Sequence, residues 1–205
     1  MNLDRRLMAY AATAAAGLSA AAESDAAVVF SPGFTFGNGS TNNINFDNAG
    51  NEEYVFAHRT ASNRLQLLKD DQTIDANSYR TTAANTHPAA LTAGTAISAA
   101  STYANTYDAT LANVSDGAGN FTIDNVDGNP EYLGVRFQLA DPGPVYYGWI
   151  GVDITNEEDL SGRVTGFAYE NSGGSIAAGA VPEPAGLALL ALGAPFLLRR
   201  RRQGI

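Results

Sequence analysis

The 205-residue chain contains no cysteine, only two histidines and few basic residues, and each shortage excludes a class of function. Without cysteine the protein cannot form disulfides, ligate iron–sulfur clusters, use a thiol nucleophile or carry a lipid on a cysteine. Two histidines are too few for a multi-histidine metal centre. Twelve basic residues against 21 acidic ones give a net charge of −9. Since phosphate binding needs a concentrated basic surface, we expect no nucleic-acid partner. No cofactor is expected either.

Charged residues make up only 16% of the chain, and the basic ones are concentrated near its two ends. Between residues 28 and 180 there are six basic and 17 acidic residues, so this middle part has a net charge of −11. The other basic residues are Arg5, Arg6 and Arg199–Arg202. Basic, apolar ends around an acidic, polar middle are typical of a chain with a targeting signal at each end.

Residues 1–27 have the composition of a secretory signal peptide. Arg5 and Arg6 give a positive start, and residues 7–22, LMAYAATAAAGLSAAA, form an Ala-rich apolar stretch that predicts a signal helix. A buried or amphipathic Ala-rich helix would look similar, but the position, the length and the paired arginines favour the signal peptide. Motifs of the A-x-A type allow cleavage after Ala22 or after Ala27, and the sequence leaves both open.

Residues 179–205 combine a short proline motif, an apolar run and a basic block. The motif is Val181, Pro182, Glu183 and Pro184; the apolar run is 185–198, AGLALLALGAPFLL; the block is Arg199, Arg200, Arg201 and Arg202. As a helix the run would be about 21 Å long at about 1.5 Å per residue, against ~30 Å for the hydrocarbon core of a bilayer. This length suits a temporary anchor better than a permanent one, with the arginines on the cytoplasmic side.

These C-terminal residues resemble the PEP-CTERM sorting signals, in which a Pro-Glu-Pro motif precedes a short hydrophobic helix and an Arg-rich tail. Pro182, Glu183 and Pro184 match the motif, and Arg199–Arg202 match the tail. The resemblance implies export by the Sec machinery, transient association with the inner membrane, and processing near the motif by an exosortase, a membrane-embedded transpeptidase-like enzyme. It also implies a final place at the cell surface or outside the cell, in a bacterium that makes exopolysaccharide. Whether the mature protein is released or attached stays open.

Residues 28–178 have the pattern of an all-β domain. Short alternating apolar runs are separated by turns rich in Gly, Asn, Asp and Pro, without a helical period or an internal repeat. In residues 132–139, YLGVRFQL, alternate side chains share one strand face: Leu133, Val135, Phe137 and Leu139. With 146–154 and 163–170 this run predicts an antiparallel meander. The expected fold is therefore an antiparallel β-sandwich or jelly-roll-like domain.

Shorter strands are expected at residues 28–30, 44–46, 54–56, 65–69 and 121–123. Ser31-Pro32-Gly33 is expected to end the first of them. Residues 81–115 have few large apolar side chains. They predict an irregular excursion, weak strands around 95–98 and 111–114, or a disordered loop.

The last third of this domain also resembles the exported domains that precede many such sorting signals. The matching segments are residues 132–137, 147–150, 168–170 and 176–179, with Val135 in place of the usual Phe. The resemblance implies an exported β-domain and no particular activity.

Five groups of residues are candidates for sites of chemistry. Residues 47–54, DNAGNEEY, have oxygen-bearing side chains around a glycine, as calcium loops do, but Ala49 takes the place of a ligand. Residues 124–129, DNVDGN, match no better, so an ordinary turn is the preferred interpretation of both. Tyr146, Tyr147 and Trp149 could stack on sugars, although such a pair as Tyr147 and Trp149 usually fills the core between two sheets.

The remaining candidates fit catalysis poorly. Glu157, Glu158 and Asp159 lie in a single turn, whereas glycoside hydrolysis needs two carboxylates opposed across a cleft. His58 and His87 have no serine or cysteine nucleophile in a recognisable context, so structural roles are expected for both. We therefore expect a non-enzymatic surface or extracellular-matrix protein that is sorted by an exosortase. The alternative is a lectin-like module that binds extracellular polysaccharide, with or without calcium.

Overall fold

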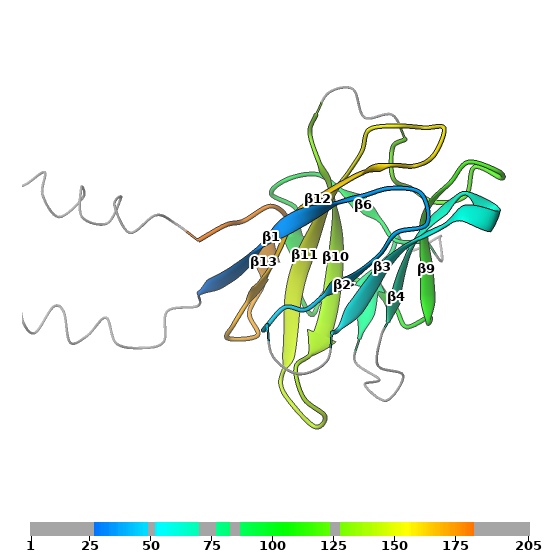
Figure 1. Ribbon diagram of the computed structural model, residues 1–205. Helices are drawn as coiled ribbons and strands as arrows, with labels where there is room; N and C mark the ends of the chain where they lie inside the picture. The colour runs from blue at the N-terminus through cyan, green and yellow to red at the C-terminus, as the bar shows by residue number, and fades with distance from the viewer. Residues whose placement is uncertain (1–26, 49–51, 70–76, 83–86, 124–127, 183–205) are drawn as a thin grey trace, which may run out of the picture.

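The computed structural model describes residues 27–48, 52–69, 77–82, 87–123 and 128–182 (Figure 1). Within these ranges the chain is all-β, and its only helical element is the 3-10 turn η2 (Thr60–Ser62). The expected signal helix, the apolar run 185–198, Glu183, Pro184 and Arg199–Arg202 lie outside the described residues. None of the helical structure found in the described ranges has the length and apolar character needed to cross a membrane.

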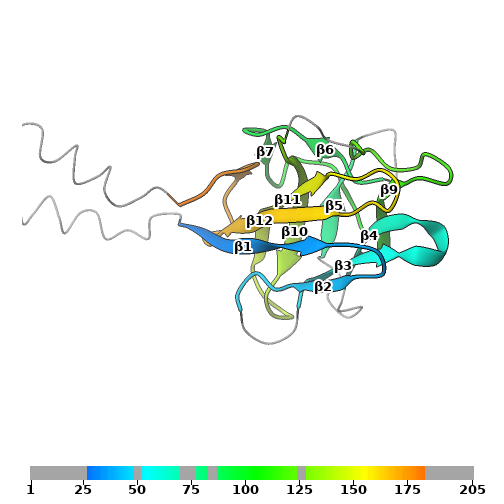
Figure 2. The ribbon, with the colours of Figure 1, turned by 45° about the horizontal axis from the view of Figure 1, so that its top comes forward.

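Seven strands form one large antiparallel sheet (Figures 1 and 2). Their order is β1 (Val28–Phe36), β12 (Gly162–Glu170), β11 (Val145–Ile154), β10 (Glu131–Gln138), β5 (Ser78–Arg80) and β8 (Tyr103–Ala104), with β6 (Ala90–Leu91) also paired to β10. The expected meander is confirmed, because β10, β11 and β12 are consecutive antiparallel neighbours.

A second antiparallel sheet has the order β2 (Thr41–Ile44), β3 (Tyr54–Arg59), β4 (Arg64–Lys69) and β9 (Asp108–Asn113). The strands β7 (Ala96–Ile97) and β13 (Ile176–Ala177) pair with each other. β7 and β9 confirm the weak strands expected around residues 95–98 and 111–114.

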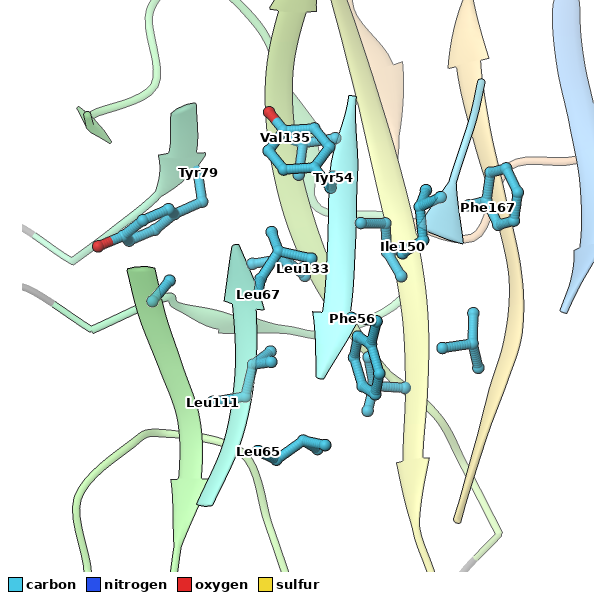
Figure 3. Close-up of a cluster of buried hydrophobic side chains, with 14 of the residues drawn as sticks. Tyr54, Phe56, Leu65, Leu67, Tyr79, Leu111, Leu133, Val135, Ile150 and Phe167 are labelled. Atoms are coloured by element: carbon cyan, nitrogen blue, oxygen red, sulfur yellow. The ribbon is translucent and has the colours of Figure 1, made fainter. Parts of the chain in front are cut away.

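The main core lies between the two large sheets, so the expected antiparallel sandwich is present. The large sheet contributes the fully buried Leu133, Val135, Phe137 and Ile150. Figure 3 shows several of these side chains close to those of the second sheet, among them Tyr54, Phe56, Leu65, Leu67 and Leu111. Apolar faces of two sheets bury each other in this arrangement, which supplies most of the stabilisation of such a fold.

The strand β1 is longer than the sequence predicted, because Ser31-Pro32-Gly33 does not end it. It runs to Phe36 and is the edge strand of the large sheet, paired with β12. An edge strand tolerates a proline, since one side of its backbone needs no ladder hydrogen bond. Gly33 is required by contact, because a Cβ there would overlap the carbonyl group of Val164.

Three other strand predictions were wrong in detail. In β4 the alternating pattern of residues 65–69 predicted one buried and one exposed face. Both faces are buried, since Gln66 and Leu68 are covered as well as Leu65 and Leu67. Residues 121–123 form no strand, although Phe121 is buried. The strand expected at residues 44–46 is instead β2, which ends at Ile44. Phe46 lies after the strand, and its side chain is buried in the main core together with that of Ile44.

We predict that Phe46→Ala lowers the free energy of unfolding by about 3–5 kcal/mol, the usual cost of removing a buried aromatic ring. The Phe46 ring stacks on Phe137 with centroids 4.3 Å apart and meets Phe167 edge-on at 5.3 Å. Urea unfolding measures the change. Tyr107→Ala is the control, because Tyr107 is half exposed and a surface substitution costs about 0.5 kcal/mol or less. Equal losses in the two variants would contradict this account of the core.

Candidate functional site

A second apolar cluster lies on the face of the large sheet that is turned away from the main core. Tyr147 and Trp149 of β11 supply its aromatic side chains, and both are buried. Its other buried members are Ala89, Leu91, Ile97, Ala168, Ile176 and Ala178. Tyr147 and Trp149 were expected to fill the core between the two sheets. This was wrong, because they are buried on the opposite face of the large sheet. Residues from 88–107 and from the C-terminal part of the domain cover them instead.

The C-terminal part of this cover, residues 176–180, is called the strap below. Its strand β13 pairs with β7, and Ala178 exchanges two backbone hydrogen bonds of 2.9 Å with Gly94 and Thr95. Gly179 has φ +79°, and a Cβ there would come within 2.8 Å of the Tyr132 ring, so glycine is needed at this position. The strap is thus held by backbone hydrogen bonds and by close packing.

The indole of Trp149 fixes the end of the strap. Its Nε1–H donates to the carbonyl oxygen of Ala180 at 3.0 Å. The Tyr132 ring meets it edge-on at 5.3 Å and Phe30 lies 6.2 Å away. Trp149 is only 3% exposed, so its ring offers no open face to a sugar. Tyr147 is buried too, and Tyr146 is partly buried against the main core.

The chain leaves the domain directly after this anchor. Val181 is 53% exposed and Pro182 is exposed as well, so the first two residues of the predicted sorting motif stand clear of the fold. The start of the described chain lies nearby, where Ala27 and Asn171 are joined by two hydrogen bonds of 3.0 and 3.1 Å. Both views show the blue start of β1 and the orange end of the chain on the same side of the domain (Figures 1 and 2).

In the expected calcium loop 47–54, the carboxylates of Glu52 and Glu53 bind groups of the domain itself. Glu53 is buried and accepts a hydrogen bond from the Phe46 amide at 2.8 Å. Glu52 accepts one from the Asn43 side chain at 2.7 Å. The pKa of Glu53 is raised from 4.5 to about 7, mainly by burial; the Phe46 amide acts in the opposite direction, and Asp47 adds to the rise. A buried carboxyl that binds the backbone is a poor calcium ligand.

The acidic residues 157–159 form a turn. Residues 124–127 of the second expected patch lie outside the described part, and Gly128 after them has φ +66°, as a turn glycine does. The pKa of the Asp159 carboxyl is lowered by hydrogen bonds from Ser161, first from its side chain and then from its amide, which donates at 3.0 Å. Glu157 and Glu158 are exposed in the same turn. In the described ranges no three His, Cys, Asp or Glu side chains are grouped so as to hold a metal ion.

The two histidines lie in different parts of the fold. The Nδ1 atom of His58 accepts a hydrogen bond from the Gly39 amide at 2.9 Å, and its Nε2 lies 3.1 Å from the Asn63 side-chain oxygen. His58 therefore joins the β3–β4 hairpin to the turn before β2. His87 is partly buried in the connection that leads to β6.

Two buried carboxylates were not singled out from the sequence. Glu170 closes the turn after β12, since it accepts hydrogen bonds from the Ser172 amide and hydroxyl, at 2.9 Å each, and from the Gly174 amide. Asp153, 1% exposed, forms an ion pair of 3.0 Å with Arg163 of the neighbouring strand. The sequence could have pointed to Asp153, because it is a charged residue in an otherwise apolar strand. It could not have predicted Arg163 as the partner, because that pairing depends on the register between β11 and β12.

No protein-family model, curated protein or solved structure matches this chain.

We predict that Trp149→Phe loosens the strap while the domain stays folded. The variant keeps a ring in the cluster but loses the hydrogen bond to Ala180, which is worth about 1–2 kcal/mol. Amide exchange at Ala178 and Ala180 should accelerate about 5- to 30-fold, the factor that corresponds to this energy. Tyr147→Phe is the matched control in the same cluster. Unchanged exchange in the Trp149 variant would show that the indole does not anchor the strap.

We also predict that ionisation of Glu53 makes the domain less stable towards neutral pH. The folded state keeps this proton up to about pH 7 and the unfolded state only to 4.5, so folding binds a proton in between. Below pH 4.5 the protonated Glu53 adds fully to the free energy of unfolding. This contribution, on the order of 1–3 kcal/mol, is lost as the pH rises from 4.5 through 7. Urea unfolding at acidic and neutral pH should show this loss, and Glu53→Gln should remove it. Glu157→Gln, at an exposed position, should leave it in place.

Proposed function

We propose that this chain is an exported, non-enzymatic protein of the cell surface or extracellular matrix, sorted by an exosortase. The Sec machinery would carry it across the inner membrane, and residues 185–198 would hold it there transiently. The exosortase would then cleave near Val181, Pro182, Glu183 and Pro184, with Arg199–Arg202 on the cytoplasmic side. The sandwich or jelly-roll-like domain would finally act within the polysaccharide layer.

The observation that carries this proposal is the way in which the chain leaves the domain. Residues up to Ala180 are packed and hydrogen-bonded, whereas Val181 and Pro182 are exposed. A processing enzyme needs an extended, accessible peptide. The exposed segment coincides with the start of the motif that the sequence suggests as its target.

The use of the polar side chains supports the non-enzymatic part of the proposal. His58, Glu53 and Glu170, which could serve as acids, bases or ligands elsewhere, accept hydrogen bonds from the backbone here. Such residues hold turns and hairpins in place. Their positions support a domain whose role is to present a surface.

Expression of the full chain in a bacterium with an exosortase, and in the same strain without it, tests this function. We predict that mass spectrometry finds a C-terminus near residues 181–184 only in the first strain, and an N-terminus that begins after Ala22 or Ala27. Glu183→Ala should remain uncleaved in the membrane fraction. Glu157→Ala, an exposed acid elsewhere, should be processed normally. A chain that still ends at Ile205 in both strains would contradict the proposal.

A further inference from the structure

The end of the domain from which the chain departs has exposed apolar side chains, and the carboxylate of Glu170 beside it is buried and hydrogen-bonded to the turn 171–175. Phe30 is 40% exposed beside Trp149, and Val181 is 53% exposed directly after the strap. The turn 171–175 is hydrogen-bonded through Asn171 to Ala27, three residues before Phe30. Phe30, Val181 and the turn 171–175 are together called the exit face below.

The absence of charge extends well beyond these residues in the sequence. Neither residues 27–46 nor residues 171–182 include a Lys, Arg, Asp or Glu, although residues 28–180 contain 17 acidic side chains. The segment 88–107, which pairs with the strap through β7, is uncharged as well. Glu170, which directly precedes residue 171, is acidic, but its side chain is buried.

The covalent chain limits how far the exit face can be from the apolar run. Pro182 is three residues from Ala185, where that run begins. Three residues of fully extended chain span at most about 10 Å. If residues 185–198 are inserted in a bilayer, as the proposed function requires, Pro182 must lie within about this distance of the inserted segment.

Because the strap is held on the domain, the short distance between Pro182 and the apolar run also restricts how the domain can be oriented at the membrane. The Trp149–Ala180 hydrogen bond and the β7–β13 pairing fix the position of Ala180 relative to the sheets, and Pro182 follows only two residues later. A domain held this close cannot turn an arbitrary side to the membrane. Anionic lipid headgroups repel acidic surfaces, so the uncharged side is the one that can approach them.

We propose that, while the C-terminal segment is inserted, the exit face lies against the surface of the lipid bilayer, with Phe30 and Val181 at the level of the headgroups. This proposal rests on the proposed function, because it needs the insertion of residues 185–198. It goes further by assigning a lipid-contacting surface to the folded domain itself. Side chains with an apolar body are favoured at this depth.

The absence of cysteine in the native chain makes the test direct. The full chain carrying Phe30→Cys, labelled with an environment-sensitive fluorophore, is reconstituted into vesicles of phosphatidylethanolamine and phosphatidylglycerol that contain quencher-bearing lipids. Ser175→Cys, at an exposed residue of the turn, is a second labelling site that leaves the apolar side chains intact. Val114→Cys is the control, since Val114 is 44% exposed and its amide binds the carbonyl oxygen of Asn63, directly after the η2 turn. Figure 1 shows the cyan segment around η2 at the end of the domain opposite to the orange end of the chain.

We expect all three labelled chains to float with the vesicles and to keep the circular dichroism spectrum of the native chain. The labels at positions 30 and 175 should be quenched several-fold more strongly than the label at 114. Flotation with equal quenching at all three positions would overturn the lipid-contacting face and leave the proposed function intact. A chain that fails to float would overturn both, since residues 185–198 would then not insert.

Discussion

The strand β11 has apolar side chains on both of its faces, and the rest of the structure depends on the need to bury them. Ile150 and Val152 point to one side, Tyr147 and Trp149 to the other, and all four are buried. An antiparallel sheet usually leaves one face in water. Here the four-stranded sheet covers one face of β11, and the chain has to supply a second cover for the other.

That second cover ties the C-terminal end of the domain to its centre. It consists of residues from 88–107 and of the strap, so part of the apolar burial of β11 comes from residues 176–180. Because the Trp149 indole also binds the Ala180 carbonyl, the folded domain determines where the chain leaves it. The same burial that removes Trp149 from sugar binding thus fixes the position of the segment proposed for processing.

The acidic composition has a structural counterpart in the way single carboxylates are used. Glu53 accepts a hydrogen bond from the Phe46 amide, and Glu170 accepts one from the Ser172 amide in the turn after β12. Asp153 forms an ion pair with Arg163 of the adjacent strand. Buried carboxylates of this kind need partners, since an unpaired polar group in a core is costly. Glu170 lies directly behind the exit face, where its carboxylate is buried and binds the amides of Ser172 and Gly174 in the turn 171–175.

The local pattern of the sequence determined the strand character of this protein and much of its order. Alternation in residues 132–139 and the turns that follow predicted the meander of β10, β11 and β12. A strand with one apolar face can be recognised locally, because its apolar residues recur at every second position. Pattern alone could not show that β1 continues through Pro32, that β4 is covered on both faces, or that Trp149 lies outside the main core. These features depend on which strand becomes an edge and which distant segment packs on a second face. Such contacts join residues far apart in the chain, such as Trp149 and Ala180, and only the tertiary structure decides them.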